Sequence, residues 1–246
     1  MVNVFFATAA VSSYRTDVPK TNDERMATPP STNDPSARLT ALRNRLDAVD
    51  TGIHRLLRER FEIVEEIGAA KGPHEPVIRP AREAAVIENR LALHSGAMPK
   101  EMLAHLWRTL ITAACTIQRP FAVHTAGAID VALFLYGPIA VTMHETAEAA
   151  VAALGEGDVA VVSQELRWWE TTSNASIICR CSTTEGPGAM IFAGSGVTAG
   201  TGPEAAIVRE GRPLVVSASE IGPDDRVLGR YHPFPIEIPA ARTSAP

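Results

Sequence analysis

Apolar residues recur at alternating steps of three and four between residues 37 and 71 of this 246-residue chain. The segment contains no proline and two glycines, Gly52 and Gly68. The pattern predicts one long helix of about 33 residues, about 50 Å in length, with an apolar seam along one side. The seam consists of Leu39, Leu42, Leu46, Val49, Ile53, Leu56, Ile63 and Ile67. So long an apolar seam needs a partner along its length.

Two shorter helices are expected after Gly72 and Pro73, which end the long one. The second helix extends from Pro80 to His94, and a proline suits the first turn because the N–H there has no intrahelical acceptor. The third helix extends from residue 99 to residue 119, and Pro120 ends it. Residues 37–120 are therefore predicted to form an all-α domain of one long and two shorter helices.

Short apolar runs bounded by Gly, Pro and Asp follow residue 120 and predict an α/β domain over residues 121–246. Residues 130–137 and 158–164 are interpreted as buried strands, with a helix over residues 144–157 between them. Further strands are predicted at residues 175–181, 188–194, 213–219 and 226–232. The domain boundary is placed near Arg119 and Pro120.

The first 36 residues differ in composition from the rest of the chain. Residues 20–36 are rich in Pro, Ser, Thr, Asn and Asp, so we expect residues 1–36 to form a disordered tail. The short apolar stretch at the N-terminus has no basic segment before it, which argues against a signal peptide. The sequence does not decide between Met1 and Met26 as the start.

The composition of the chain argues against two classes of protein, nucleic-acid binders and membrane-spanning proteins. The net charge of −5 excludes nucleic-acid binding by bulk electrostatics, and no apolar run approaches the roughly 18 residues that span a membrane. Three cysteines, Cys115, Cys179 and Cys181, suit a reducing compartment, so we expect a cytoplasmic protein. The Cys-Arg-Cys sequence is typical of a buried strand rather than of a metal site, because no second Cys or His pair stands nearby at ligand spacing.

One inward position of the long seam is charged. The position after Leu56 holds Arg60, and a buried arginine without a partner is very costly. Two interpretations stay open: Arg60 pairs with a glutamate such as Glu83, or it lines a pocket for an anion. Lys71 points within about 20° of the same direction, about 16 Å further along the axis, so both side chains can reach one small ligand. Lys71 alone is also typical of a helix C-terminus.

Two further polar residues stand beside apolar stripes. Arg43 follows Leu42 and lies about 25 Å along the helix axis from Arg60. No small molecule bridges that distance, so Arg43 serves the same pocket only if a second copy of the helix supplies it; otherwise it is a solvated surface residue. Gln118 continues an apolar stripe of the third helix, where it is either part of a frayed end or a neutral donor at the pocket.

The start of the second helix is densely charged, with Arg79, Arg82 and Glu83 around Pro80. A carboxylate in the first turn suits the positive end of the helix dipole, which favours a capping role. Glu83 also shares the inward side with Ile87, where a carboxylate needs a cation or a hydroxyl group as its partner. The two roles, cap and site residue, are compatible.

Together the helices offer cationic donors, one carboxylate and one amide. No Cys or Ser nucleophile stands with an associated His, and we recognise no metal cluster or phosphate loop, so we expect no cofactor and no metal. The set suits binding of a small dicarboxylate more than acid–base chemistry. The candidate residues are Arg43, Arg60, Lys71, Arg82, Glu83 and Gln118.

Residues 37–120 resemble the all-helical AroQ class of chorismate mutases. The matching segments are LRNRLDAVD, LLRERFEIVEEIGAAK, PVIRPAREAAVIENRL and ACTIQ. The resemblance implies an intertwined homodimer that rearranges chorismate to prephenate in phenylalanine and tyrosine biosynthesis, by a unimolecular pericyclic shift without a covalent intermediate. Catalysis then depends on holding the reactive conformer and on stabilising negative charge at the ether oxygen.

The resemblance also implies a role for each candidate. Arg60 and Arg43 of the partner subunit bind the two carboxylates, and Lys71 and Gln118 donate to the ether oxygen. Glu83 accepts a hydrogen bond from the ring hydroxyl.

Arg82, by the same resemblance, supports the carboxylate end of the substrate. Two positions depart from the family pattern. Arg79 stands where some members carry an acidic residue, and Ala114 stands where Ser or Thr is common, so one hydroxyl contact is missing.

Residues 144–165 resemble a stretch of prephenate dehydratases in which a helix leads to a strand and a ligand loop. The Thr-Arg-Phe signature expected downstream is absent, and residues 181–194 occupy its place. We therefore expect residues 121–246 to form an accessory domain, either a degenerate dehydratase or a regulatory domain, with an aromatic amino acid as candidate effector. Trp168 and Trp169 either stack on such a ligand or pack in a core or interface.

Three alternatives to a chorismate mutase stay open. An isochorismate pyruvate-lyase uses the same helical fold and a similar cationic pocket. A bifunctional mutase–prephenate dehydratase and a non-enzymatic dimeric sensor are the others.

Overall fold

The computed structural model describes residues 35–72, 75–137, 139–171, 175–197 and 200–239. The tail predicted to be disordered lies outside this part of the chain, apart from its last two residues. The chain forms two compact units, one up to His54 and one from Arg55 onward. Within the described residues, no helix has the length and the apolar character needed to cross a lipid bilayer.

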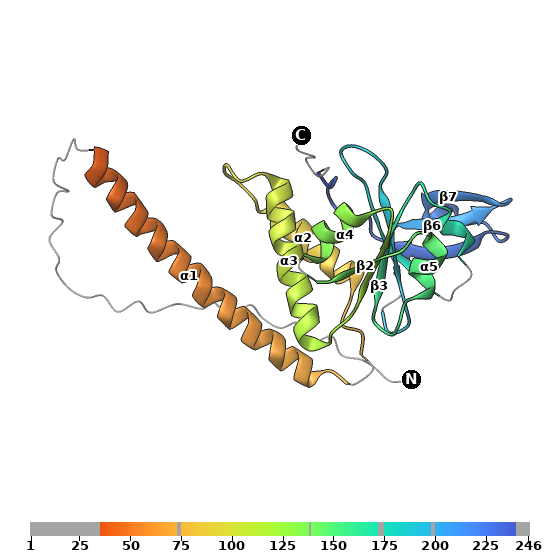
Figure 1. Cartoon of the computed structure of the whole chain (residues 1–246), viewed down its shortest axis with the longest axis horizontal. Helices are drawn as coiled ribbons and strands as arrows, with labels where there is room; N and C mark the ends of the chain where they lie inside the picture. Colours follow the sequence, from red (N-terminus) through yellow and green to blue (C-terminus); the bar gives the residue numbers. More distant parts are fainter. Residues whose placement is uncertain (1–34, 73–74, 138, 172–174, 198–199, 240–246) are drawn as a thin grey trace. The chain divides into compact units, whose positions relative to one another are not determined.

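The long helix α1 extends from Pro35 to Ala70, as the three-four pattern predicted (Figure 1). Its apolar seam is open to solvent in the single chain, because all eight members from Leu39 to Ile67 are 46–59% exposed. The buried residue of α1 is instead Val64, which lies outside that seam. The helix therefore has two faces with different roles. The face with Val64 packs within the chain, and the apolar seam is exposed to solvent in the single chain.

Helix α2 (Pro80–Ala92) and helix α3 (Lys100–Gln118) begin and end within two residues of their predicted bounds and pack against each other (Figure 1). Pro80 occupies the first position of α2, where its missing N–H leaves no bond unmade. The buried face of α3 carries Ala104, Arg108, Ile111, Thr112, Ala114 and Cys115. This face includes a charged residue, Arg108.

The C-terminal part begins with a five-stranded sheet in the order β2-β1-β3-β5-β4. Strands β1, β2 and β3 are parallel to one another, and β5 and β4 join in antiparallel pairing. Two crossover helices connect the parallel strands. The elements are β1 (Val123–Ala126), α4 (Ile129–Tyr136), β2 (Val141–Met143), α5 (Ala147–Ala152), β3 (Val159–Ser163), β4 (Ser176–Cys181) and β5 (Ala189–Ala193).

A smaller antiparallel sheet follows, with strand order β7-β6-β8. Its strands are β6 (Glu204–Arg209), β7 (Arg212–Ser217) and β8 (Arg226–Tyr231). Two short 3₁₀ turns, Trp168–Glu170 and Ala218–Glu220, interrupt the connections. The prediction of an α/β C-terminal part after an all-helical part is confirmed.

Helices cover both faces of the five-stranded sheet (Figure 1). On one face, Ile87 of α2 and Ile111 of α3 share a hydrophobic cluster with Leu135 of α4 and Ile191 of β5. On the other face, α5 packs in a second cluster that includes Trp168, Phe192 and Tyr231. The helical segment 80–118 is thus built into the same core as the sheet.

The pattern at residues 130–137 was misread as a strand, because the structure places helix α4 there. A short apolar run does not distinguish a buried strand from a buried helix, and a parallel β1–β2 pair requires a crossover between its strands. The sequence analysis also missed strands β1, β2 and β6. The other predicted strands and the helix within 144–157 are confirmed.

A fragment limited to residues 35–120 should unfold at a lower temperature than the full chain, because it lacks the sheet and α4. Exposing the side chains of Ile87 and Ile111 lowers the free energy of unfolding by about 1.5–3 kcal/mol for each residue. Circular dichroism melting measures the difference. Residues 35–246 serve as the control and should melt like the full chain, because they keep every residue of both clusters. A fragment that melts cooperatively at the full-chain temperature would contradict the shared core.

Candidate active site

The inward face of α1 carries Arg60, Val64, Gly68 and Lys71, spaced by four, four and three residues. Gly68 allows close packing, since a Cβ atom there would lie 3.2 Å from Cγ of Gln118 on α3. The two cations thus lie on the side of α1 that meets α3. The spacing argument that Arg60 and Lys71 share a direction is consistent with this arrangement.

Arg60 is half-buried and bonds to the backbone of α3. One guanidinium N–H group donates to the carbonyl oxygen of Leu110 over 3.2 Å, and the guanidinium carbon lies 5.3 Å from the ring centre of Phe61. Burial lowers the pKa of Arg60 below its ordinary value, and the Cys115 thiol opposes this effect. Arg60 does not pair with Glu83, which leaves its guanidinium without a carboxylate in the single chain among the ion pairs of the described residues.

Lys71 and Gln118 meet directly. The ammonium Nζ of Lys71 donates to the side-chain oxygen of Gln118 over 2.7 Å and to the carbonyl oxygen of Pro76 over 3.4 Å. The amide nitrogen of Gln118 donates to the carbonyl oxygen of Ala114, 3.1 Å away. Burial, followed by the nearby Arg79 guanidinium, lowers the pKa of Lys71. Two side chains 47 residues apart therefore meet at one place, where the ammonium group of Lys71 donates to the amide oxygen of Gln118.

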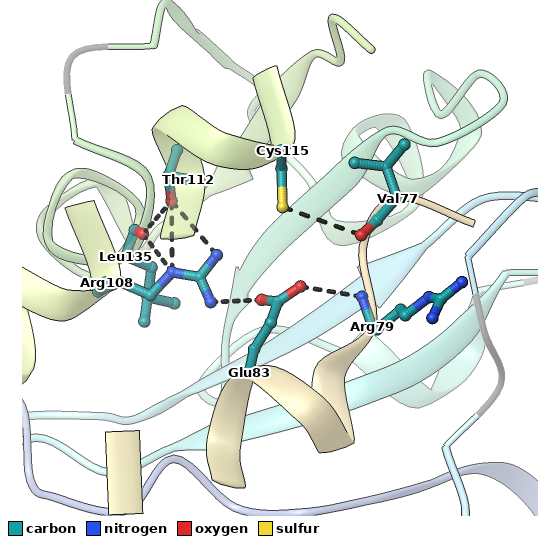
Figure 2. A network of polar contacts seen from close by, with 7 residues as sticks. All are labelled: Val77, Arg79, Glu83, Arg108, Thr112, Cys115 and Leu135. Atoms are coloured by element: carbon teal, nitrogen blue, oxygen red, sulfur yellow. Dashed lines mark hydrogen bonds and ion pairs between the residues drawn. The ribbon is translucent and has the colours of Figure 1, made fainter. Parts of the chain in front are cut away.

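Glu83 acts as a helix cap and as a site residue at the same time. One carboxylate oxygen accepts a hydrogen bond from the backbone N–H of Arg79 over 2.9 Å, which satisfies a donor at the start of α2. The other oxygen accepts from Arg108 on α3 over 2.5 Å (Figure 2). Glu83 is 9% exposed, so both contacts are needed to offset the loss of water around its carboxylate.

Arg108 is a member of this cluster that the sequence analysis missed. It is 6% exposed, and its remaining N–H groups donate to the carbonyl oxygen of Leu135 and to the hydroxyl oxygen of Thr112 (Figure 2). Burial by itself lowers the pKa of Arg108, but Glu83 and Tyr136 outweigh that effect and raise it, so the guanidinium stays charged.

A signal for Arg108 was present in the sequence. It stands four residues after Ala104 and three before Ile111, inside the buried stripe of α3. The same reasoning that singled out Arg60 on the long helix applies to this position.

Cys115 lies between the charged groups. Its thiol interacts electrostatically with Glu83, Arg108, Lys71 and Arg60, and burial raises its pKa to about 12. The thiol is therefore neutral near neutral pH and is no nucleophile. Its Sγ atom is 3.9 Å from the carbonyl oxygen of Val77 (Figure 2).

Two predicted site residues do not join this cluster. Arg43 is exposed and belongs to the unit that ends at His54. Arg82 is exposed on the outer side of α2, where it and Arg79 line a hollow together with Thr201. Arg79, which had no assigned role, forms an exposed ion pair with Glu75 over 3.3 Å, and its backbone N–H donates to the carboxylate of Glu83.

The assembled groups can bind anions but offer no nucleophile. Arg60 and Lys71 supply cationic N–H donors, Gln118 supplies a neutral amide, and Glu83 supplies a carboxylate acceptor. Among the described residues, no group of three or more His, Cys, Asp or Glu side chains is arranged to hold a metal ion. Such a site suits a small anion whose charge shifts during a reaction.

The tryptophan pair belongs to the second cluster. Trp168 is 5% exposed and packs among the residues of that core, and Trp169 meets it edge-on with ring centres 5.6 Å apart. Core packing, one of the two interpretations of this pair, therefore describes Trp168. Cys179 and Cys181 lie on strand β4, as predicted for the Cys-Arg-Cys sequence.

Comparison with known proteins adds a family to this geometry. The family described as chorismate mutase type II matches residues 42–119. The bifunctional chorismate mutase/prephenate dehydratase of Neisseria gonorrhoeae is 36% identical over 85 residues, which are 35% of this chain and 23% of that protein. The corresponding protein of Aquifex aeolicus is 33% identical over 94 residues, or 36% of this chain and 26% of that protein.

A shorter relative is matched over most of its length. The 4-amino-4-deoxychorismate mutase of Streptomyces pristinaespiralis is 38% identical over 97 residues, which cover 37% of this chain and 74% of that protein. In contrast, the chain spans only about a quarter of the length of the bifunctional relatives. No solved structure matches the chain. The helical fold, the converging cations and the match over residues 42–119 agree, and the chain belongs to the chorismate mutase type II family.

Proposed function

We propose that the protein is a chorismate mutase, an isomerase that rearranges chorismate to prephenate in aromatic amino-acid biosynthesis. The observation that carries the proposal is the meeting of Lys71 and Gln118 at 2.7 Å, on the face of α1 that also presents Arg60. Two helices, α1 and α3, thus bring cationic and amide groups together, and α2 contributes the buried carboxylate of Glu83. The family and the names of the relatives support the same activity.

The reaction needs positioning and charge stabilisation rather than a nucleophile. In the proposed mechanism, Arg60 binds one carboxylate and holds the substrate in its reactive conformer. Lys71 and Gln118 donate to the ether oxygen, where negative charge grows as the C–O bond breaks. Glu83 accepts a hydrogen bond from the ring hydroxyl. In the free protein Lys71 and Gln118 bond to each other, and the substrate oxygen would take its place between them.

We further propose that a homodimer completes the site. The apolar seam of α1, which is 46–59% exposed in the single chain, supplies the surface for a second copy. An antiparallel pair of long helices would bring Arg43 of the partner subunit to the pocket that contains Arg60. Arg43 would then bind the second carboxylate of the substrate. Arg82 would support the carboxylate end from the outer side of α2.

The C-terminal part is proposed to be an accessory domain. Its sheet shares a core with α2 and α3, so it stabilises the helices that carry Glu83 and Gln118. Regulation by an aromatic amino acid is a hypothesis for this domain, and Trp168 is unavailable for stacking because it is buried. Three free cysteines fit the proposed cytoplasmic location.

Replacement of Lys71 or Gln118 tests the mutase mechanism. Lys71→Met should lower kcat/KM for chorismate by about 100-fold or more, and Gln118→Leu by about tenfold or more, because each removes a donor to the developing oxyanion. Absorbance of chorismate follows the reaction, and thermal melting shows whether the variants fold. Lys100→Met, which changes an exposed lysine of the same protein, should leave activity unchanged. Full activity in Lys71→Met would point to a scaffold without a pocket.

The dimer is tested at the seam of α1. Leu46→Glu combined with Ile53→Glu should give a monomer without mutase activity, because a charged seam cannot pair and Arg43 is no longer supplied. Light scattering after gel filtration gives the oligomeric state. Ala48→Glu lies on the opposite side of the helix and should leave the dimer intact.

Mixed dimers test the position of Arg43 directly. Arg43→Ala and Arg60→Ala should each be inactive alone, and activity should return when the two are unfolded together and refolded as a mixture. A mixture that stays inactive would show that both arginines serve a site within one chain or that one of them serves none.

Substrate choice separates the mutase from a lyase of the same fold. The wild-type protein should convert chorismate to prephenate and release no pyruvate from isochorismate. Liquid chromatography of the products resolves both reactions. Pyruvate from isochorismate without prephenate from chorismate would replace the mutase by an isochorismate pyruvate-lyase. Phenylpyruvate formed from prephenate would add a dehydratase activity.

A further inference from the structure

We propose that Arg108 positions the Glu83 carboxylate and makes the site select a neutral hydroxyl group over a cationic amino group on the substrate ring. The inference rests on the proposed function, in which Glu83 accepts a hydrogen bond from the ring substituent. Arg108 acts through Glu83 and is therefore a positioning and specificity residue. Its position on the buried face of α3 gives it this role (Figure 2).

The guanidinium of Arg108 is fixed by partners other than Glu83. Its Nε–H donates to the carbonyl oxygen of Leu135 over 2.8 Å and lies 3.3 Å from the hydroxyl oxygen of Thr112. That hydroxyl group donates in turn to the same Leu135 carbonyl over 3.0 Å. The guanidinium carbon also lies 5.3 Å from the ring centre of Tyr136. Leu135 and Tyr136 end helix α4, so the C-terminal domain sets the place of the Arg108 charge.

The carboxylate of Glu83 is held from two sides and still has acceptor capacity. Arg79 donates to one oxygen from the backbone, and Arg108 donates to the other from the guanidinium. A carboxylate accepts about four hydrogen bonds, so two lone-pair positions remain for the ring substituent. Contacts to Arg79 and Arg108 orient the carboxylate, and Arg108 is itself held by the Leu135 carbonyl (Figure 2).

The charge of the pair decides which substituent is accepted. A hydroxyl group donates a hydrogen bond to Glu83 and brings no charge of its own. An aliphatic amine is protonated near neutral pH, and as it approaches Glu83 it also approaches the Arg108 guanidinium. Glu83 is already neutralised by Arg108, so an ammonium group meets repulsion that no free carboxylate compensates. The buried position strengthens the effect, because both groups of the pair are at most 9% exposed.

A relative shows that this choice exists within the family. The Streptomyces pristinaespiralis protein is named for a substrate in which an amino group replaces the hydroxyl group at ring position 4. The two substrates differ in the substituent that Glu83 is proposed to contact. A residue that controls the charge beside Glu83 is therefore suited to separate them.

Kinetics with the two substrates test the inference in the full-length protein. The quantity measured is the ratio of kcat/KM for chorismate to kcat/KM for 4-amino-4-deoxychorismate. Wild type should favour chorismate, and Arg108→Gln should lower the ratio by about tenfold or more, because the carboxylate then becomes available to an ammonium group. Arg90→Gln is the matched control. Like Arg108, Arg90 lies 5.3 Å from the centre of an aromatic ring, that of Trp107, but it makes no contact with Glu83 among the hydrogen bonds and ion pairs of the described residues. This control should leave both constants unchanged.

The possible outcomes separate failure of the role proposed for Arg108 from failure of the proposed mutase activity. Failure of the wild type to convert either substrate would overturn the proposed function. If the wild type converts chorismate but Arg108→Gln leaves the ratio unchanged, the inference alone is overturned and Arg108 is a packing residue. The same conclusion follows if Arg108→Gln lowers kcat/KM equally for both substrates. A wild-type preference for the amino substrate would do the same.

A second variant keeps the test decisive if Arg108→Gln does not fold. Arg108→Lys retains the charge but cannot bond to Leu135, Thr112 and Glu83 together. It should keep the preference for chorismate while kcat falls by about tenfold and KM changes by less than about threefold, because Glu83 loses its fixed orientation. An unchanged kcat would overturn the positioning role.

Discussion

A buried guanidinium needs a counter-charge and a full set of acceptors, and the structure around Arg108 follows from this requirement. The counter-charge is Glu83, and the acceptors are the Leu135 carbonyl and the Thr112 hydroxyl. These partners come from α2, α3 and α4. Removing one member of such a pair costs about 3–5 kcal/mol, because the other charge is left buried and alone. The packing of the helices onto the sheet and the orientation of the proposed catalytic carboxylate therefore depend on the same contact.

The two arginines that are proposed to bind the substrate carboxylates, Arg60 and Arg43, differ in their burial in the single chain. Arg60 is only half-buried and bonds to a backbone carbonyl, so its charge is still available to an anion. Arg43 is exposed on α1. A buried charge that is paired with an opposite charge of the same chain stabilises the structure. A partly buried charge without such a partner remains available to bind an ionic ligand. By this criterion Arg60 and Lys71 are suited to bind substrate, and Arg108 is suited to organise the carboxylate.

Helix α1 connects these features through its two faces. The face with Val64 and Gly68 packs on α3 and brings Lys71 to Gln118, because Gly68 leaves room for close approach. The other face carries eight large apolar residues that the single chain leaves exposed. A strong apolar periodicity predicts that a seam is buried, but it does not indicate whether the surface that packs against the seam belongs to the same chain or to a second copy. The sequence predicted the periodic seam but counted Arg60 among its inward positions, whereas the structure places Arg60 with Val64, Gly68 and Lys71 on the face that packs within the chain.

The sequence by itself determined the helical part and indicated most residues of the candidate site. Prolines, glycines and the three-four repeat placed α1, α2 and α3 within a few residues, because these signals are local. Arg60, Glu83 and Gln118 were found because each stands among apolar positions, and Lys71 was found because it shares the direction of Arg60. The tertiary structure alone decided which charges meet: Glu83 pairs with Arg108 rather than Arg60, and α4 is a helix where an apolar run had suggested a strand. Both depend on contacts between segments distant in sequence, and the identity of a buried partner or of a short buried element is set by those contacts rather than by local periodicity.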